Sequence, residues 1–205
     1  MSKLLDHIMS MEQKDVIKPE TLAHLTVVTG ELIACDPLVP HTESFSRTIS
    51  PGVYPVVAWW LQEEQAIAAV ELRLSETRPV RWEMATRPGQ DIGDLEDGYI
   101  FGYPVDTGLG CFADAKAIAQ MEELEERLAR ELGDQFISFY DNKVEFILEE
   151  NDDNWGDLVL NTEEGLNVVM FRSGFGDGYY ASYWGFSAGG EVVSLVTDFG
   201  LFPVL

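Results

Sequence analysis

The chain has 205 residues, a length typical of one domain or of two small ones. Hydrophobic residues make up 46% of it, enough for a sizeable core, whereas 36 Asp and Glu face only 13 Lys and Arg, for a net charge of −23. Such a surface disfavours binding to nucleic-acid phosphates or anionic lipid and favours solubility, cations or a basic protein partner.

The first 20 residues are expected to be a separate helical segment. A short polar helix is predicted over residues 3–14, and Pro19 ends it. The segment carries charges throughout, unlike a signal peptide, and no run of about 18 apolar residues is present to cross a membrane. Cys35 and Cys111 form neither a C-x-x-C pair nor a disulfide framework. We therefore expect a cytoplasmic protein with a single domain over residues 21–205.

Short apolar runs predict strands in the first half of this domain. Two runs flank Thr29-Gly30 and stop at Asp36-Pro37, and two more flank a polar turn at residues 62–65. Ala and Glu are common in this second pair, so a helix over residues 62–72 is an alternative. Residues 79–86 form another strand candidate, residues 87–98 a loop, and residues 99–112 an extended segment interrupted by glycines.

The clearest predicted helix covers residues 114–132. Two i,i+4 Glu–Arg pairs lie on its outer face, and Asp114 and Gly133 are suited to cap its two ends. Its apolar stripe, with spacings of three and four residues, consists of Ala117, Met121, Leu124, Leu128 and Leu132.

The remainder of the sequence predicts β structure. Residues 136–141 and 144–150 are expected to pair as strands across Asn142. Four more strands are expected over residues 157–161, 166–172, 179–186 and 191–198, and their short Gly-rich connections favour an antiparallel meander. The fold class is therefore α+β, mainly antiparallel sheet with a C-terminal meander and one clear helix.

The letters Gly185-Phe186-Ser187-Ala188-Gly189 match G-x-S-x-G, the nucleophile elbow of serine hydrolases. That motif requires a strand, a sharp turn and a helix, but here a second alternating, strand-like run follows. All three histidines also precede residue 42. We therefore interpret Ser187 as a residue of a tight hairpin, with glycines supplying the turn.

Cys111 is the weak catalytic candidate. It lies just before the predicted helix start at Asp114, where a helix N-terminus lowers a thiol pKa, and the neighbouring glycines offer N–H groups to an oxyanion. His24 or His41 would be the base. The alternative is a small buried residue, which is the usual environment of a free cysteine.

Five aspartates at turns or element ends are candidates for a shared binding site, with a divalent cation as the possible cofactor: Asp36, Asp106, Asp114, Asp177 and Asp198. Each also suits a local role in a turn or helix cap. The acidic segment from Asp152 to Glu163 partly fits a calcium loop, but Asp157 occupies the position where the sharp turn needs glycine, so an EF-hand is rejected.

The aromatic run from Phe171 to Phe186 predicts a central strand. Tyr179 and Tyr183 would share one strand face, with Tyr180 and Trp184 on the other. Trp184 is the aromatic candidate for ligand binding, and core packing is the alternative. A base-stacking platform is disfavoured because a cationic groove is missing beside the run.

Several stretches, "GELIACDPL", "PGVYPV", "RWEMA", "PVDTGLGCFAD" and "SGFGDGYYASYWGFSAGGEVVSLVTDF", together resemble a family of uncharacterised bacterial proteins classed as a domain of unknown function. The resemblance covers about residues 24 to 200, and the closing G-x-G-D-G-x-Y…W-G…L-x-x-D-F segment is its most specific part. It implies one domain and no assigned reaction. Its recurring positions here would be Asp36, Pro37, Pro51, Gly52, Tyr54, Asp106, Gly108, Asp114, Gly176, Asp177, Gly178, Tyr179, Trp184, Gly185, Asp198 and Phe199.

Two functions remain open from the sequence. The first is an acidic, non-catalytic binding or regulatory protein, inhibitor-like or immunity-like, with a basic protein partner and no cofactor. The alternative is a small hydrolase that uses Cys111 or a metal held by the aspartates.

Overall fold

The computed structural model describes residues 3–10 and 16–201, which form strands and helices in a mixed order. In chain order the elements are α1 (Lys3–Ser10), β1 (Ile17–Val27), β2 (Leu32–Cys35), β3 (Gly52–Leu61), β4 (Ala66–Arg73), β5 (Arg81–Met84), the 3₁₀ helix η1 (Ile92–Asp94), β6 (Tyr103–Val105), β7 (Leu109–Asp114), α2 (Ala115–Leu132), the 3₁₀ helix η2 (Gly133–Gln135), the π-helix η3 (Tyr140–Val144), α3 (Glu145–Glu149), β8 (Trp155–Asn161), β9 (Leu166–Arg172), β10 (Gly178–Phe186) and β11 (Val192–Asp198). Among the described helices, none combines the length and apolar character that a membrane crossing requires.

The strands form two sheets. Sheet A has the order β1-β3-β4-β11-β10-β5, with β6 paired to β10, and sheet B has the order β2-β7-β9-β8. Each strand pairing is antiparallel. The predicted α+β class with mainly antiparallel sheet is confirmed.

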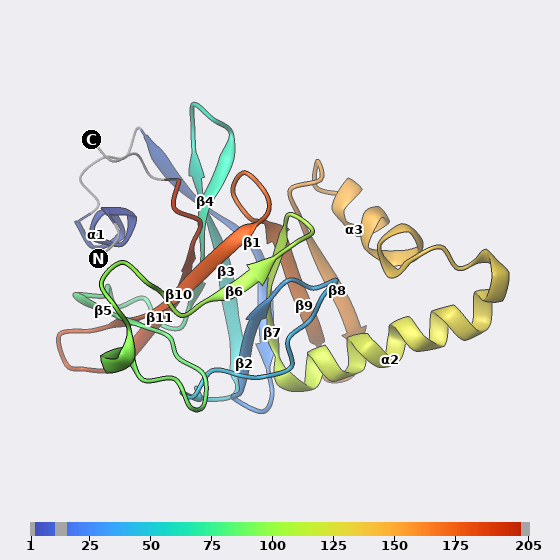
Figure 1. The fold of residues 1–205 in the computed structure, drawn as a ribbon, viewed down its shortest axis with the longest axis horizontal. Coiled ribbons are helices and arrows are strands. Elements are labelled where there is room, and N and C mark those ends of the chain that lie inside the picture. Colours follow the sequence, from blue (N-terminus) through green and yellow to red (C-terminus); the bar gives the residue numbers. More distant parts are fainter. Residues whose placement is uncertain (1–2, 11–15, 202–205) are drawn as a thin grey trace.

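Three apolar clusters hold the layers together. The largest lies between the two sheets and includes Leu25, Phe112 and Trp184. A second joins sheet B to α2 and α3, and a third joins sheet A to α1. The helices thus lie at opposite ends of the molecule, with the sheets between them (Figure 1). Helix α1 packs on sheet A, and β1 begins at Ile17, so Pro19 lies in a strand. Residues 11–14 of the helix predicted over residues 3–14 lie outside the described residues.

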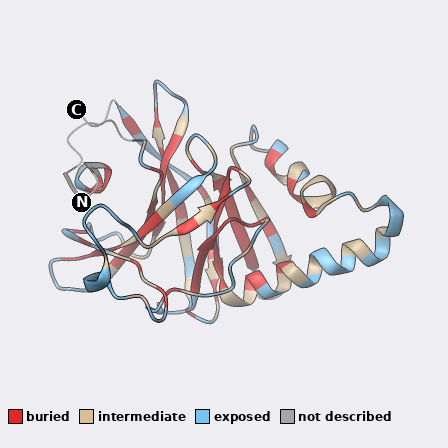
Figure 2. Cartoon of the chain, in the orientation of Figure 1, coloured by how far each residue is buried: buried red, intermediate tan, exposed pale blue. Residues whose placement is uncertain are grey.

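Helix α2 confirms the predicted amphipathic helix, with its end caps. Asp114 caps its start by accepting a hydrogen bond from the Lys116 N–H, and Gly133 ends it with φ 52°. Its buried residues, Ala117, Ile118 and Met121, all lie in the first half. The second half, which is largely exposed, extends beyond the sheets (Figure 2).

One predicted β segment is helical, and one helix considered as an alternative is a strand pair. Residues 136–150 contain η3 and α3 in place of paired strands, because Phe139, Val144 and Leu148 are buried at spacings of five and four residues, which suit a π turn followed by an α turn. Conversely, the helix considered for residues 62–72 is wrong, since β3 and β4 form a hairpin there.

The four C-terminal strands form two hairpins, and the single meander expected for them is not formed. Strands β8 and β9 pair in sheet B, whereas β10 and β11 pair in sheet A. The connection between them reverses through Gly174 and Gly176, which have φ 64° and 120°, and the Ser173 hydroxyl donates to the Gly176 carbonyl. This turn therefore sends the chain from one sheet to the other.

Candidate functional site

Ser187 lies in the tight hairpin between β10 and β11. Its hydroxyl donates to Glu191 Oε2 at 2.9 Å and accepts from the Gly189 and Glu191 N–H groups at 3.2 Å. Gly190 has φ 86°, and strand β11, not a helix, follows. The predicted hairpin role of Ser187 is confirmed, because its polar contacts close the turn.

Two of the five candidate aspartates are buried and satisfied by backbone donors. Asp36 accepts from Leu38 N, Asp106 N, Thr107 N and the Thr107 hydroxyl at 2.8–3.0 Å. Asp114 caps α2 and also accepts from the two N–H groups of residues 28 and 29 and from a threonine hydroxyl at 2.8–3.0 Å. These carboxylates join loops to strands in the way that buried charges require.

The other three aspartates lie in different surroundings. Asp106 and Asp177 are exposed, and Asp198 is half-buried with its carboxylate accepting from the Gly200 N–H at 2.8 Å. Among these five residues, Asp36 and Asp106 are joined by a hydrogen bond, in which the backbone N–H of Asp106 is the donor. Within residues 3–10 and 16–201, no three His, Cys, Asp or Glu side chains are grouped so that they could hold a metal ion.

Cys111 is enclosed in strand β7, opposite Cys35 of β2. Both thiols are fully buried, and their sulfur atoms lie 3.6 Å apart. The hydrogen bond with Cys35, together with burial, raises the pKa of the Cys111 thiol, which opposes the thiolate that a nucleophile needs. His24 and His41 are both exposed. The small-buried-residue alternative describes this environment.

Trp184 belongs to the core between the sheets. Its side chain is 3% exposed and packs edge-on against Phe45, with ring centroids 5.8 Å apart. Its neighbour Tyr183 packs toward α1 on the opposite face of β10. Strand β10 is therefore central and apolar on both faces, and Trp184 is enclosed and not accessible to a partner.

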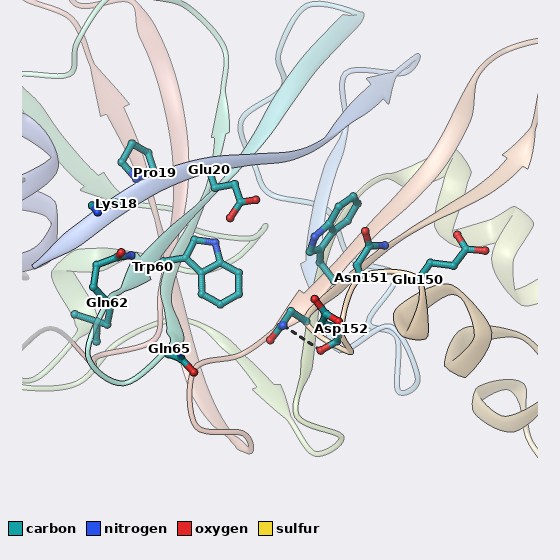
Figure 3. A pocket seen from close by; sticks show the side chains of 12 residues that line it. Lys18, Pro19, Glu20, Trp60, Gln62, Gln65, Glu150, Asn151 and Asp152 are labelled. Carbon is teal, nitrogen blue, oxygen red and sulfur yellow. Dashed lines mark hydrogen bonds between the residues drawn. The ribbon is translucent and has the colours of Figure 1, made fainter. Parts of the chain in front are cut away.

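A cleft of about 1050 Å³ opens between the two sheets, where the first half of β1 and the β3–β4 hairpin face the segment that joins α3 to β8. We call it the Trp60–Trp155 cleft. Figure 3 shows Trp60 and Glu20 on the sheet A side, with Asn151 and Asp152 across from them. Its lining residues are Lys18, Pro19, Glu20, Trp60, Leu61, Gln62, Gln65, Glu150, Asn151, Asp152, Asn154 and Trp155.

The cleft combines half-buried indoles with exposed carboxylates. Trp60 and Trp155 are both partly buried and pack against the inter-sheet core. The indole N–H of Trp60 is shielded from water and has no hydrogen-bond partner among the described residues. Glu20, Glu150 and Asp152 are exposed around it, and a single lysine is the one cation of the lining.

Local backbone geometry shapes both walls of the cleft. Among the described residues, the non-glycine positions with positive φ are Gln65, Asp152 and Asp153, at 52°, 53° and 60°. The first lies in the β3–β4 turn and the others in the α3–β8 segment. Arg172 fixes this segment by donating from its Nε to the Asp153 carbonyl at 2.8 Å. The acidic wall is thus presented by a defined, strained turn.

The cleft borders the acidic helical arm, which we define as residues 115–154. This arm has twelve Asp and Glu against four Lys and Arg, a net charge of −8. Two large apolar side chains, Ile137 and Phe146, are 76% and 59% exposed there. Negative charge and exposed apolar groups therefore occur together on the arm, whose last residues line the cleft.

Sequence reasoning did not identify the cleft. Adjacent side chains on a strand point to opposite faces, so Trp59-Trp60 signalled one indole on each face of β3. Trp59 does pack toward α1, and Trp60 toward sheet B. That signal gave no link to Trp155, because the two sheets meet only in the folded chain.

Family comparison covers most of the domain. One family model matches residues 25–197, which includes β2–β10 entirely, all but the last residue of β11, and the last three residues of β1. The search of curated proteins finds no match, and neither does the search of solved structures. The chain therefore belongs to the family described as "Protein of unknown function (DUF4241)".

Proposed function

We propose that this protein is a non-catalytic binding module, inhibitor-like or immunity-like, that holds a basic segment of a partner protein in the Trp60–Trp155 cleft. The observation that carries the proposal is the composition of the cleft: two indoles and three exposed carboxylates against one lysine. An arginine or lysine side chain can lie over an indole face and donate to a carboxylate at the same time. No cofactor is needed for this role.

The charge of the chain supports the same kind of partner. A net charge of −23 attracts basic proteins at long range and repels nucleic acids and anionic membranes. The acidic helical arm extends this field beside the cleft, and its exposed Ile137 and Phe146 offer apolar contact once the partner is bound.

The environments of the candidate reactive groups also favour binding over hydrolysis. Cys111 is fully buried with a raised thiol pKa, and Ser187 closes a hairpin. The carboxylate oxygens of Asp36 and Asp114 accept hydrogen bonds from backbone N–H groups, which leaves little capacity to bind a substrate or a metal.

The proposal can be tested by titrating the protein with an arginine- and lysine-rich peptide while recording tryptophan fluorescence. Trp59, Trp82 and Trp184 are at most 7% exposed, so a change on binding reports mainly the two half-buried indoles of the cleft. We expect E20Q/E150Q/D152N to weaken binding about tenfold, because three partly exposed charge pairs contribute roughly 0.5 kcal/mol each.

The matched control is E123Q/E131Q/D134N, which removes the same three charges from exposed positions of the arm away from the cleft. It should bind within about twofold of the wild type. Equal weakening by both triple variants would show that general charge, and not the cleft, holds the peptide. No fluorescence response from either indole would reject the cleft as the binding site.

A further inference from the structure

Arg87 lines a second pocket, on a different part of the surface from the Trp60–Trp155 cleft. This Arg87 pocket has a volume of about 310 Å³, and its lining also includes one acidic residue, Glu43, together with His41, Thr42, Gln90, Gly102, Pro104 and Tyr179. Arg87 is 8% exposed, and it is the one Lys or Arg that is buried within the described part of the chain. A buried cation at the base of a small pocket raises the question of what balances its charge.

The guanidinium is held entirely by neutral groups. Its Nε donates to the Glu43 carbonyl at 3.1 Å, Nη1 to the Gly102 carbonyl at 2.9 Å, and Nη2 to the Ala34 carbonyl at 2.9 Å. The Phe45 ring lies under it, with the centroid 5.5 Å from Cζ. Among the residues that the structure describes, no carboxylate oxygen lies within 4.0 Å of it.

Several more exposed arginines show the reverse arrangement. Arg73, Arg81 and Arg130 are more exposed, yet each has a carboxylate partner within reach. The chain has 36 Asp and Glu to draw on, so a shortage of anions does not explain the unpaired guanidinium. Buried charges in proteins are normally paired, since desolvation without a counter-ion is costly.

The segment that contains Arg87 carries less net charge than the rest of the chain. Residues 41–90 contain six Asp and Glu and five Arg, a net of −1, which leaves −22 for the rest of the chain. Arg47 and Arg81 both lie over the Phe186 ring, at 5.1 Å and 4.1 Å from its centroid, and both pair with Glu83. The segment around Arg87 therefore adds little net negative charge of its own.

We propose that the Arg87 pocket binds an oxyanion, namely the carboxylate or phosphate group of a small ligand, as the counter-ion of Arg87. A guanidinium has five N–H donors, and the three carbonyls use three of them, so one N–H remains on each terminal nitrogen. The Thr42 hydroxyl and the Gln90 amide line the same space as further donors. The carbonyl contacts fix the guanidinium plane, and a fixed plane is the property that oxyanion recognition uses.

The first test observes the arginine Nε–H signals of ¹⁵N-labelled wild-type protein during titration with sodium phosphate and, separately, with sodium acetate at constant ionic strength. We expect a saturable shift of the Arg87 signal with a Kd of about 1–10 mM for the better ligand. Arg172 is the internal control, because its Nε also donates to a carbonyl, that of Asp153 at 2.8 Å. The stronger of the two anions then identifies a phosphate or a carboxylate as the preferred group.

A pair of surface variants makes the test independent of Arg87 itself. Thr42 and Thr48 are both exposed, and only Thr42 lines the pocket. T42E places a carboxylate at the pocket and should abolish the Arg87 shift, whereas T48E should retain it at an unchanged melting temperature. The inference is overturned if Arg87 shows no saturable shift with either anion, if Arg172 shifts equally, or if T42E binds as well as T48E. None of these outcomes bears on the Trp60–Trp155 cleft.

Discussion

In the Trp60–Trp155 cleft the carboxylates of Glu20, Glu150 and Asp152 lie in water, whereas the guanidinium of Arg87 is 8% exposed and enclosed by carbonyls. An exposed charge costs little to keep and acts at a distance through solvent, so it suits the recruitment of a partner. A buried charge is costly and short in range, and it persists only where neighbouring dipoles hold it. Removal of the buried guanidinium should therefore destabilise the fold more than removal of the exposed carboxylates.

The largest effect is expected at Arg87. Arg87→Met removes the donors of three carbonyls and should lower the free energy of unfolding by about 3 kcal/mol, or the melting temperature by roughly 6–12 °C. Denaturant unfolding measures this. Arg130→Met is the control, because Arg130 is 70% exposed and makes only a 3.6 Å surface pair with Glu126, so its loss should stay below about 0.5 kcal/mol. Equal losses in the two variants would show that burial does not distinguish the two cations.

A second large effect is expected where the walls of the cleft are tied together. Asn167 of β9 is 4% exposed; its amide donates to the His24 carbonyl and to Asp157, and its oxygen accepts from the Thr26 N–H. Asn167→Ala should cost about 2 kcal/mol, because it leaves polar groups of β1 without partners. It should also weaken peptide binding in the cleft.

The control for this prediction is Asn151→Ala, a half-buried position of the cleft lining whose side chain makes no hydrogen bond to the described residues. It should retain wild-type stability within about 0.5 kcal/mol in the same denaturant series. A stable N167A protein with unchanged peptide affinity would mean that the sheets keep their spacing without this contact.

Salt separates the two regions more sharply than mutation alone. Raising NaCl from about 50 to about 500 mM should weaken the basic peptide roughly tenfold, because the exposed carboxylates are screened. The triple variant E20Q/E150Q/D152N should show a much flatter dependence. The stability loss of R87M should be the same at both salt concentrations, since contacts between a buried guanidinium and carbonyls are not screened. A salt-dependent R87M loss would contradict this reading of the pocket.

Local sequence rules identified much of the fold and few of the long-range contacts. The caps of α2 at Asp114 and Gly133 and the Ser187 hairpin follow from short-range geometry and are confirmed, whereas the apolar stripe of α2 is buried only in its first half. Residues 136–150 differ from the prediction because two short apolar runs flank Asn142 and resemble paired strands, whereas the buried Phe139, Val144 and Leu148 have the spacing of a helix. The division of the C-terminal strands between two sheets depends on packing across the core, which short connections do not encode.

The candidate sites also divide into those that local sequence predicts and those that depend on long-range contacts. The local roles of Asp36 in an Asp-Pro turn and of Asp114 in a helix cap were predictable from their neighbours. The cleft and the Arg87 pocket were not, because their parts come from distant segments: Trp60 with Trp155, and Arg87 with the carbonyls of Ala34, Glu43 and Gly102. Every residue has a backbone carbonyl, so the residue types in a sequence do not show which carbonyls accept hydrogen bonds from Arg87.

The smallest predicted effect concerns Asp157, whose carboxylate is half-buried beside Asn167. Burial raises the pKa of Asp157, and the hydrogen bond from Asn167 opposes that rise only in part. Because the pKa is raised in the folded state, the folded chain binds this proton more tightly than the unfolded chain does. The contribution of Asp157 to stability is therefore most favourable at acidic pH, and it falls as the pH rises through the raised pKa.

Asp157→Asn keeps an acceptor for Asn167 and removes the charge. Near pH 3, where Asp157 is protonated in both the folded and the unfolded chain, the variant should melt at the same temperature as the wild type. At pH 7 it should melt about 1 °C higher, and melting temperatures recorded across this pH range measure the difference. Asp153→Asn, at an exposed position with φ 60°, is the control and should not change the slope with pH at this site. A D157N protein that is less stable than the wild type at neutral pH would show that the charged hydrogen bond to Asn167 outweighs desolvation, and that the tie between the cleft walls depends on an ionised carboxylate.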